Sequence, residues 1–448
     1  MRFPCHVRGA FLLERLVSSA GRGVRVRRLG GSRAGEMRLT RLLRNGAVTP
    51  DAMLAEAAAR LSERSTGRPV LAIQDTTVVR SEGGGGLYLH ACIALDAEDD
   101  ALLGLAHAEF AWRDHGGKAS YRRRPIADKQ SRRWLDGADA AARACSSART
   151  LILVGDREND IYAAFARRPA NADLLVRAGG WDRALATGEL LSRTLDGLPE
   201  VGRYRVDLAA GPGRRARTAL VGLRFASVTL KRPRNSVEKT ALPAKLTLQA
   251  VDVREIDPPA GVEPVHWRLL TTLPVGTAAE AAGIADLYRR RWAIEQLFRT
   301  LKTQGFDIEA LAIAHEGALK NLVTAALVAA TIVQQLVHAR EGHTPKSQAP
   351  EGDASGAPTS GLRPALDAFS PEDIPLIEAI GASLEGRTQR QKNPHPKGSL
   401  AFASWVCARL GGWTGYYGKP GPIVMLEGWF EFQSIKRGLS SLGLALNV

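Results

Sequence analysis

Two apolar stretches of the chain end in an aspartate, and they give the first outline of the fold. Residues 70–78 form a β-branched apolar run that turns polar at Asp75, and residues 150–156 form a second run that ends at Asp156. Such short runs are typical of buried strands. Both predicted strands therefore carry a carboxylate at or near one end.

The segments around these two strands predict a mixed α/β unit. Alternating or apolar stretches indicate further strands, and apolar positions at helical spacing indicate helices between them. The predicted strands cover 87–95, 101–112 and 174–177, and the predicted helices cover 131–145 and 159–167. The order βββαβαβ, with carboxylates at strand ends, is typical of the ribonuclease-H-like architecture, whose sheet has antiparallel and parallel strands.

The flanking regions have different patterns. Residues 35–64 predict two short helices, the second starting at Thr49-Pro50-Asp51. Residues 180–275 contain short alternating segments separated by Gly, Pro and Arg, which predicts a β-rich insertion. A long helix is predicted from Ala278 to about Lys302, and a very apolar helix from 319 to 337. Residues 341–363 have the Gly, Pro, Ser and Ala content of a flexible linker.

The charge of the chain makes nucleic acid the leading partner. The net charge is +15 and the pI is about 10.0, and a surplus of Lys and Arg gains free energy by displacing counterions from a polyanion. The alternative is that the arginines reflect a high-GC genome and are simply solvated. The arginines cluster, which favours nucleic acid, at Arg22–Arg28, Arg122–Arg124, Arg132–Arg133 and Arg289–Arg291.

Location signals point to the cytoplasm. We expect no membrane span, because no apolar run reaches the roughly 20 residues that a span needs, and the opening residues do not resemble a secretory signal. The four cysteines are too far apart for a CxxC motif and too few for a disulfide framework, so we expect reduced, space-filling thiols.

The predicted helix around Glu295 presents several functional groups on one face. At about 100° per residue, Tyr288, Arg291, Glu295 and Lys302 fall on a stripe about 60° wide, beside an apolar sector. For an isolated helix, a solvent-facing Arg291–Glu295 ion pair is the simpler interpretation.

The two strand-end aspartates change that interpretation. Each aspartate alone is more often a turn or cap residue than a ligand. Together with a glutamate on a helix, however, Asp75 and Asp156 form a set of hard oxygen ligands suited to two Mg²⁺ ions. Two such ions can activate the attacking oxygen and stabilise the leaving oxygen of a phosphoryl displacement. The sequence therefore predicts a metal-dependent site for chemistry on nucleic acid.

Residues 288–302 resemble the Y-R-E-K signature of the insertion-sequence-four family of DDE transposases. The resemblance holds at all four positions of the signature, which are Tyr288, Arg291, Glu295 and Lys302. Residues 72–77 and 156–161 resemble the first and second aspartate motifs of that family. The resemblance covers roughly residues 29–445, with further matches at 256–259, 267–271, 410–413 and 427–429.

The resemblance implies an enzyme that requires two Mg²⁺ ions, for which Mn²⁺ can substitute. It nicks each transposon end, uses the freed 3′-hydroxyl to cut the other strand through a hairpin, and joins the ends to target DNA. Asp75, Asp156 and Glu295 take the catalytic and metal-ligand roles. The implied DNA contacts are Tyr288, Arg291 and Lys302, with Trp267 as a stacking platform for a flipped base; we add the strand-end Arg177 to this set.

Two of these residues keep an alternative. Trp267 is equally compatible with a core position in the inserted sheet. Glu158, two residues after Asp156, is either an additional acid at the site or a helix N-terminal glutamate that stabilises the dipole.

The resemblance also suggests how the chain is organised and what it binds. We expect double-stranded DNA as partner (transposon ends and target), a homodimer in a synaptic complex, no membrane, and a bacterial nucleoid location. The predicted regions are a helical N-terminal DNA-binding region (1–68), a catalytic core (69–179 and 276–340), the β-rich insertion (180–275), the linker (341–363) and a helical C-terminal dimerisation region (364–448).

Three further expectations complete the sequence-based picture. Residues 1–28 do not resemble the usual opening of the family, so we expect DNA binding with steep salt dependence and little discrimination of the terminal repeat. The alternative function is a catalytically idle, transposase-derived DNA-binding protein or inhibitor. A ribonuclease-H-like nuclease outside transposition would explain the carboxylates, but neither the insertion nor the arrangement from Trp267 to Lys302.

Overall fold

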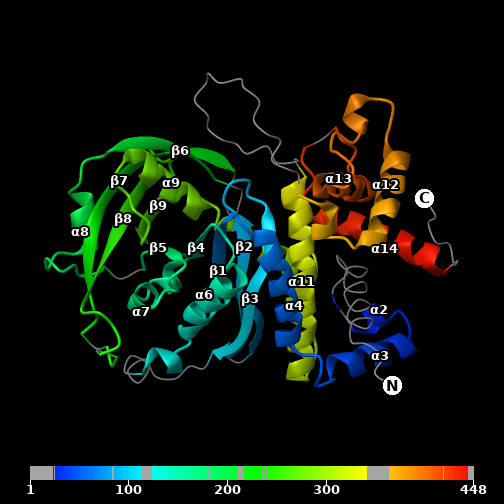
Figure 1. Cartoon of the computed structure of the whole chain (residues 1–448), viewed down its shortest axis with the longest axis horizontal. Helices are drawn as coiled ribbons and strands as arrows, with labels where there is room; N and C mark the ends of the chain where they lie inside the picture. The colour runs from blue at the N-terminus through cyan, green and yellow to red at the C-terminus, as the bar shows by residue number, and fades with distance from the viewer. Residues whose placement is uncertain are drawn as a thin grey trace.

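The apolar runs that carry Asp75 and precede Asp156 are neighbouring strands of one sheet in the computed structural model (Figure 1). The structure describes residues 24, 26–82, 85–113, 124–179, 182–208, 216–234, 236–238, 240–340, 363–416 and 418–441. Within this part of the chain, nine strands form a single sheet in the order β3-β2-β1-β4-β5-β9-β8-β7-β6. They are β1 Pro69–Glu82, β2 Gly85–Asp96, β3 Leu102–Arg113, β4 Thr150–Gly155, β5 Asp173–Arg177, β6 Gly202–Leu208, β7 Arg217–Lys231, β8 Lys245–Glu255 and β9 His266–Thr271.

The first five strands form the mixed half of the sheet. β1, β2 and β3 are an antiparallel meander, whereas β4 lies parallel to β1 and β5 lies parallel to β4. This confirms the predicted strand segments and the change from antiparallel to parallel pairing. Because β1 and β4 run side by side in the same direction, the residues that follow their paired segments lie at the same edge of the fold.

The last four strands form the antiparallel half. The prediction of strands in residues 180–275 is confirmed. These strands do not form a sheet of their own, because β9 pairs antiparallel with β5 through Leu175 and Thr271 and so continues the first half. The insertion is thereby fixed directly to the strand that ends in Arg177.

Helices cover the sheet and extend beyond it. Among the described residues they are α2 Val26–Gly30, α3 Arg33–Leu43, α4 Pro50–Ser65, α6 Arg132–Ala144, α7 Tyr162–Ala166, α8 Leu191–Asp196, α9 Ala278–Arg289, α10 Trp292–Leu301, α11 Glu316–Ala339, α12 Ile374–Leu384, α13 Leu400–Leu410 and α14 Pro422–Ser441. The predicted start of α4 is confirmed, since the Thr49 side chain accepts a hydrogen bond from the backbone N–H of Ala52 and Pro50 begins the helix. The predicted linker lies almost wholly outside the described residues.

The central helix α11 corrects one expectation. By length and composition alone α11 could cross a membrane, so the expectation that no apolar run is long enough for a span is wrong. In the fold most of its apolar residues are buried, and it stands between the sheet and the terminal helices (Figure 1). Asn321 of this helix donates hydrogen bonds to the carbonyls of Leu43 and Val48, at 2.9 and 2.7 Å, which ties it to the region between α3 and α4. In this structure α11 is a core helix.

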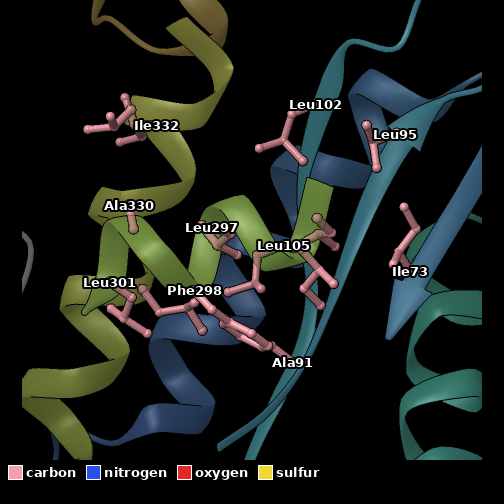
Figure 2. Packing of buried hydrophobic residues seen from close by; sticks show 14 of the residues in the cluster. Ile73, Ala91, Leu95, Leu102, Leu105, Leu297, Phe298, Leu301, Ala330 and Ile332 are labelled. Atoms are coloured by element: carbon pink, nitrogen blue, oxygen red, sulfur yellow. The ribbon is translucent and has the colours of Figure 1, made fainter. Parts of the chain in front are cut away.

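The helix that carries Glu295 packs between the sheet and α11. Leu297, Phe298 and Leu301 of α10 point into a cluster with residues of the meander and with Ala330 of α11 (Figure 2). Leu297 and Leu301 are fully buried, so this face of α10 is fixed by the hydrophobic effect. The position of α10, and with it of Glu295, is therefore set by the core.

The prediction of one continuous helix from Ala278 to Lys302 is wrong. The chain forms two helices that meet at Arg290 and Arg291, where the backbone tightens to i→i+3 hydrogen bonds from Arg291 to Tyr288 and from Ala293 to Arg290. At this break the Arg290 side chain donates to the carbonyl of Ala97 and pairs with Asp100 in the β2–β3 turn. The stripe calculated for a straight helix therefore does not hold across the break.

Candidate active site

Asp75 lies in the middle of β1, which continues to Glu82, so the prediction that the strand ends at this aspartate is wrong. Its carboxylate accepts a hydrogen bond from the backbone N–H of Thr76 at 2.7 Å, and its side chain is 17% exposed. Burial raises the pKa of Asp75 to about 6; Arg291 opposes this shift, while Asp156 and Glu295 add to it. A carboxylate in this setting gains from an additional positive charge nearby.

Asp156 directly follows β4. Ile73 of β1 pairs with Val154 of β4, so Asp75 and Asp156 each lie two residues beyond this pair on adjacent strands. The Asp156 carboxylate accepts a hydrogen bond from the backbone N–H of Glu158 at 2.8 Å, and burial raises its pKa. The structure thus brings the two predicted aspartates to one edge of the sheet.

Glu295 lies in the first turn of α10 and reaches the same edge through Arg291. The Arg291 guanidinium contacts the Asp75 carboxylate at 2.8 Å and also pairs with Glu295. Burial alone lowers the pKa of Arg291, but Tyr288, Asp75 and Glu295 outweigh it and leave the pKa above its usual value. Arg291 is therefore a permanent cation between two of the predicted ligands.

The carboxylates as placed do not form one shared ligand set. Across the residues that the structure describes, no group of three His, Cys, Asp or Glu side chains is close enough to hold one metal ion. The donor chemistry nevertheless fits a divalent cation, because Asp75 and Asp156 offer hard oxygens whose pKa values are raised by burial. Mg²⁺ is often held by one or two carboxylates together with substrate phosphates.

The residues predicted to contact DNA divide into two groups. Tyr288 and Trp267 pack edge to face, with ring centroids 5.5 Å apart, and are only 4% and 8% exposed. Tyr288 therefore does not present its ring on a surface stripe, and the core alternative for Trp267 agrees with its position. Arg177 lies beside them: it donates to the carbonyl of His266 at 2.8 Å, and burial lowers its pKa while the Tyr288 phenol raises it.

Lys302 lies apart from this group. It caps the far end of α10, about 16 Å along the helix from Arg291, and its ammonium contacts Glu309 at 2.6 Å. The structure therefore places seven of the eight predicted residues in the region around Asp75 and Asp156. Lys302 lies one helix length away.

The arginine clusters at 132–133 and 289–291 have internal partners. Arg289 pairs with Asp286, and Arg290 pairs with Asp286 and Asp100. The cluster Arg289–Arg291 is thus part of the fold and is not a set of solvated charges. Arg22, Arg25, Arg122 and Arg123 lie outside the described residues.

Sequence reasoning missed the burial of Arg133, which it grouped with the clustered arginines that favour nucleic acid. In the structure Arg133 is 8% exposed and lies on the face of α6 that packs on the sheet. Its position had a signal in the sequence, because Arg133, Gly137 and Ala141 follow one another at the spacing of a buried helix stripe. Arg133 pairs with Glu158, so the Glu158 side chain is engaged in an ion pair beside the site.

A comparison with models of protein families matches residues 107–332 of the chain to the family described as "Transposase DDE domain". The match spans just over half of the 448 residues. It includes Asp156 and Glu295 and begins after β1, the strand that carries Asp75.

Proposed function

The chain belongs to the family of transposases with a DDE domain, and from this premise we propose that it moves an insertion sequence by cut-and-paste transposition. The proposed chemistry is metal-dependent hydrolysis of phosphodiester bonds at the transposon ends, followed by strand transfer into target DNA. The single observation that supports it best is the convergence of Asp75, Asp156 and the Arg291–Glu295 pair from β1, β4 and α10.

The proposed core is ribonuclease-H-like. The five strands of the mixed half have the order β3-β2-β1-β4-β5, with a meander followed by parallel pairs, and the two aspartates lie on or directly after the two central strands. With the Y-R-E-K residues on α9 and α10, this arrangement supports membership of the insertion-sequence-four branch. The proposed regions are those given above, with residues 69–179 and 276–340 as the catalytic core.

Two Mg²⁺ ions are the proposed cofactor, with Mn²⁺ as a substitute, and Asp75, Asp156 and Glu295 are the proposed ligands. When bound, the ions would supply charge stabilisation for the attacking and leaving oxygens. Arg291 would exchange its carboxylate partners for a DNA phosphate, which frees Glu295 to join the aspartates. Guanidinium groups bind carboxylate and phosphate with the same fork of donors, so the exchange needs no change in protonation.

The proposed DNA contacts are Tyr288, Arg291, Lys302 and Arg177, with Trp267 beside a displaced base. The proposed assembly is a homodimer that pairs two transposon ends through the C-terminal helices. The substrate is double-stranded DNA, so we place its action at the bacterial nucleoid in the cytoplasm.

The experiment is strand cleavage of a plasmid that carries the DNA flanking this gene, by the full chain and by Asp75→Ala, Asp156→Ala and Glu295→Ala. We expect each variant to lose cleavage by about a thousandfold or more in Mg²⁺ while retaining DNA binding, because a ligand is lost and the fold is kept. Glu263→Gln, which alters an exposed carboxylate of the insertion outside the site, is the matched control.

Each other outcome has a defined meaning. Near-normal cleavage by one variant would remove that residue from the catalytic set. DNA binding without cleavage by the unaltered chain, in both Mg²⁺ and Mn²⁺, would favour the catalytically idle DNA-binding protein.

A further inference from the structure

One arginine on α6 links the local supports of both aspartates. The Nε of Arg133 donates to the Thr76 hydroxyl at 3.1 Å, and its Nη2 pairs with the Glu158 carboxylate. Thr76 and Glu158 are also the residues whose backbone N–H groups donate to Asp75 at 2.7 Å and to Asp156 at 2.8 Å. A single guanidinium therefore bridges the two residues that orient the two carboxylates.

The orientation of this guanidinium is fixed on every side. Its Nη1 donates to the carbonyl of Gln130 at 2.8 Å, one helical turn earlier. The Thr76 hydroxyl that accepts from Arg133 also contacts Nδ1 of His90 at 2.9 Å, and Nε2 of His90 contacts the Gln74 side-chain oxygen at 3.1 Å. Since the Gln74 oxygen can only accept, Nε2 carries the proton of a neutral His90, and Nδ1 accepts from Thr76.

The close approach of α6 to β1 depends on Gly137, one turn after Arg133. A Cβ atom at Gly137 would lie 2.3 Å from the side-chain oxygen of Gln74. Gln74 and Thr76 point to the α6 side of β1, and Asp75 between them points to the opposite side, because side chains alternate along a strand. The polar chain through Arg133 therefore fixes the Asp75 strand from behind the site.

We propose that Arg133 is a positioning residue that sets the separation and orientation of Asp75 and Asp156, and thereby how tightly this pair binds a divalent cation. This inference rests on the proposed function, because it assumes that the two aspartates are metal ligands. Arg133 acts through Thr76 and Glu158, since those two residues, and not Arg133, contact the carboxylates. Partners that orient metal ligands commonly alter metal affinity or activity 10–100-fold when they are changed.

The test measures Mn²⁺ binding to the full chain by electron paramagnetic resonance of the free ion, together with the melting temperature. We expect Arg133→Met and Arg133→Lys each to weaken Mn²⁺ binding about tenfold or more. Lysine keeps the charge but offers one point donor where arginine offers a fork, so charge alone does not restore the bridge. The control is Arg132→Lys, since Arg132 is an exposed neighbour that pairs with Asp136 at 2.9 Å.

A second pair of variants removes a single hydroxyl. Thr76→Val deletes the group that links Arg133 to the Asp75 strand, whereas Thr76→Ser keeps it, so we expect weaker Mn²⁺ binding only for valine. This pair decides the matter if the Arg133 variants fail to fold.

Two results separate the inference from the function on which it rests. Unchanged Mn²⁺ affinity in Arg133→Met and Thr76→Val, with loss of affinity in Asp75→Ala and Asp156→Ala, would overturn the role of Arg133 alone. Unchanged affinity in the two aspartate variants would overturn the proposed metal site, and the role of Arg133 with it.

Discussion

Buried carboxylates occur in both halves of the sheet, and their surroundings differ. In the antiparallel half, Glu255 accepts two hydrogen bonds from Arg217 and one from the backbone N–H of Val265, and its pKa is lowered, first of all by Arg217. Asp252 nearby contacts the His266 ring at 2.8 Å and is surrounded by three arginines of three strands: Arg254 at 3.4 Å, Arg268 at 3.6 Å and Arg224 at 3.9 Å. Glu255 and Asp252 therefore each have at least one arginine as a partner.

Asp96 of the mixed half likewise pairs with Arg68 and Arg363, but around Asp75 in that half the balance is reversed. Asp75, Asp156 and Glu295 lie around one arginine, and burial outweighs Arg291 in raising the pKa of Asp75 to about 6. Carboxylates with too little compensating charge are costly for the fold, and such perturbed groups are concentrated at functional sites. The difference indicates that the insertion uses its ion pairs for stability, whereas the sheet edge at Asp75 retains an affinity for a further cation.

The border between the two halves offers the largest expected effect. Trp267 of β9 fills the core beside Tyr288, and Trp267→Ala should lower the free energy of unfolding by about 4 kcal/mol through the cavity it leaves. Chemical denaturation measures this loss.

Cleavage assays of the same variant separate the two roles of Trp267. If base stacking is the main role, first-strand nicking will persist and hairpin formation will slow, with little change in stability. Equal loss of both steps with a lower melting temperature supports the packing role.

The next effect compares one carboxylate from each half. Glu255→Gln should lower the free energy of unfolding by about 2–3 kcal/mol, because it leaves Arg217 without its charged partner in a buried pair. Asp75→Asn should not lower it, because the amide removes a charge that burial disfavours. Urea denaturation of both variants without metal checks this, and equal losses would contradict the contrast between the halves.

The smallest effect is the pH dependence of stability without metal. The folded-state pKa of Asp75 is raised from 3.8 to about 6, so its protonated form is favoured in the native state. Its stabilising contribution is complete below about pH 4 and is lost as the pH rises through 6; the shift corresponds to at most about 3 kcal/mol, and solvent screening of this partly exposed side chain lowers that to on the order of 2 kcal/mol. For Glu255, whose pKa is lowered, the contribution is instead lost as the pH falls.

Denaturation curves between pH 4 and 7 in the presence of a chelator measure the effect of Asp75. The unaltered chain should lose stability relative to Asp75→Asn across this range. If the free energy of unfolding has the same pH dependence in both proteins, burial does not raise the pKa of Asp75.

The sequence alone determined the features that depend on local pattern. The apolar runs predicted β1 and β4 and the aspartate that follows β4, and the Thr49-Pro50 pair predicted the start of α4; the sequence did not show that β1 continues past Asp75 to Glu82. The order of strands also indicated which carboxylates would meet, because adjacent parallel strands bring their ends to the same edge. These features need only hydrophobic periodicity and capping, which act over a few residues.

Only the tertiary structure decided the features that depend on distant partners. The contact between Arg291 and Asp75 joins residues 216 positions apart, and the helix break before Arg291 has its anchor in the β2–β3 turn, through Arg290. The burial of Arg133 depends equally on where α6 packs against β1. Charged side chains look alike in a sequence whether they are solvated or paired. Whether a buried arginine is stable depends on which carboxylates the folded chain brings to it, and that is settled only when the long-range pairings form.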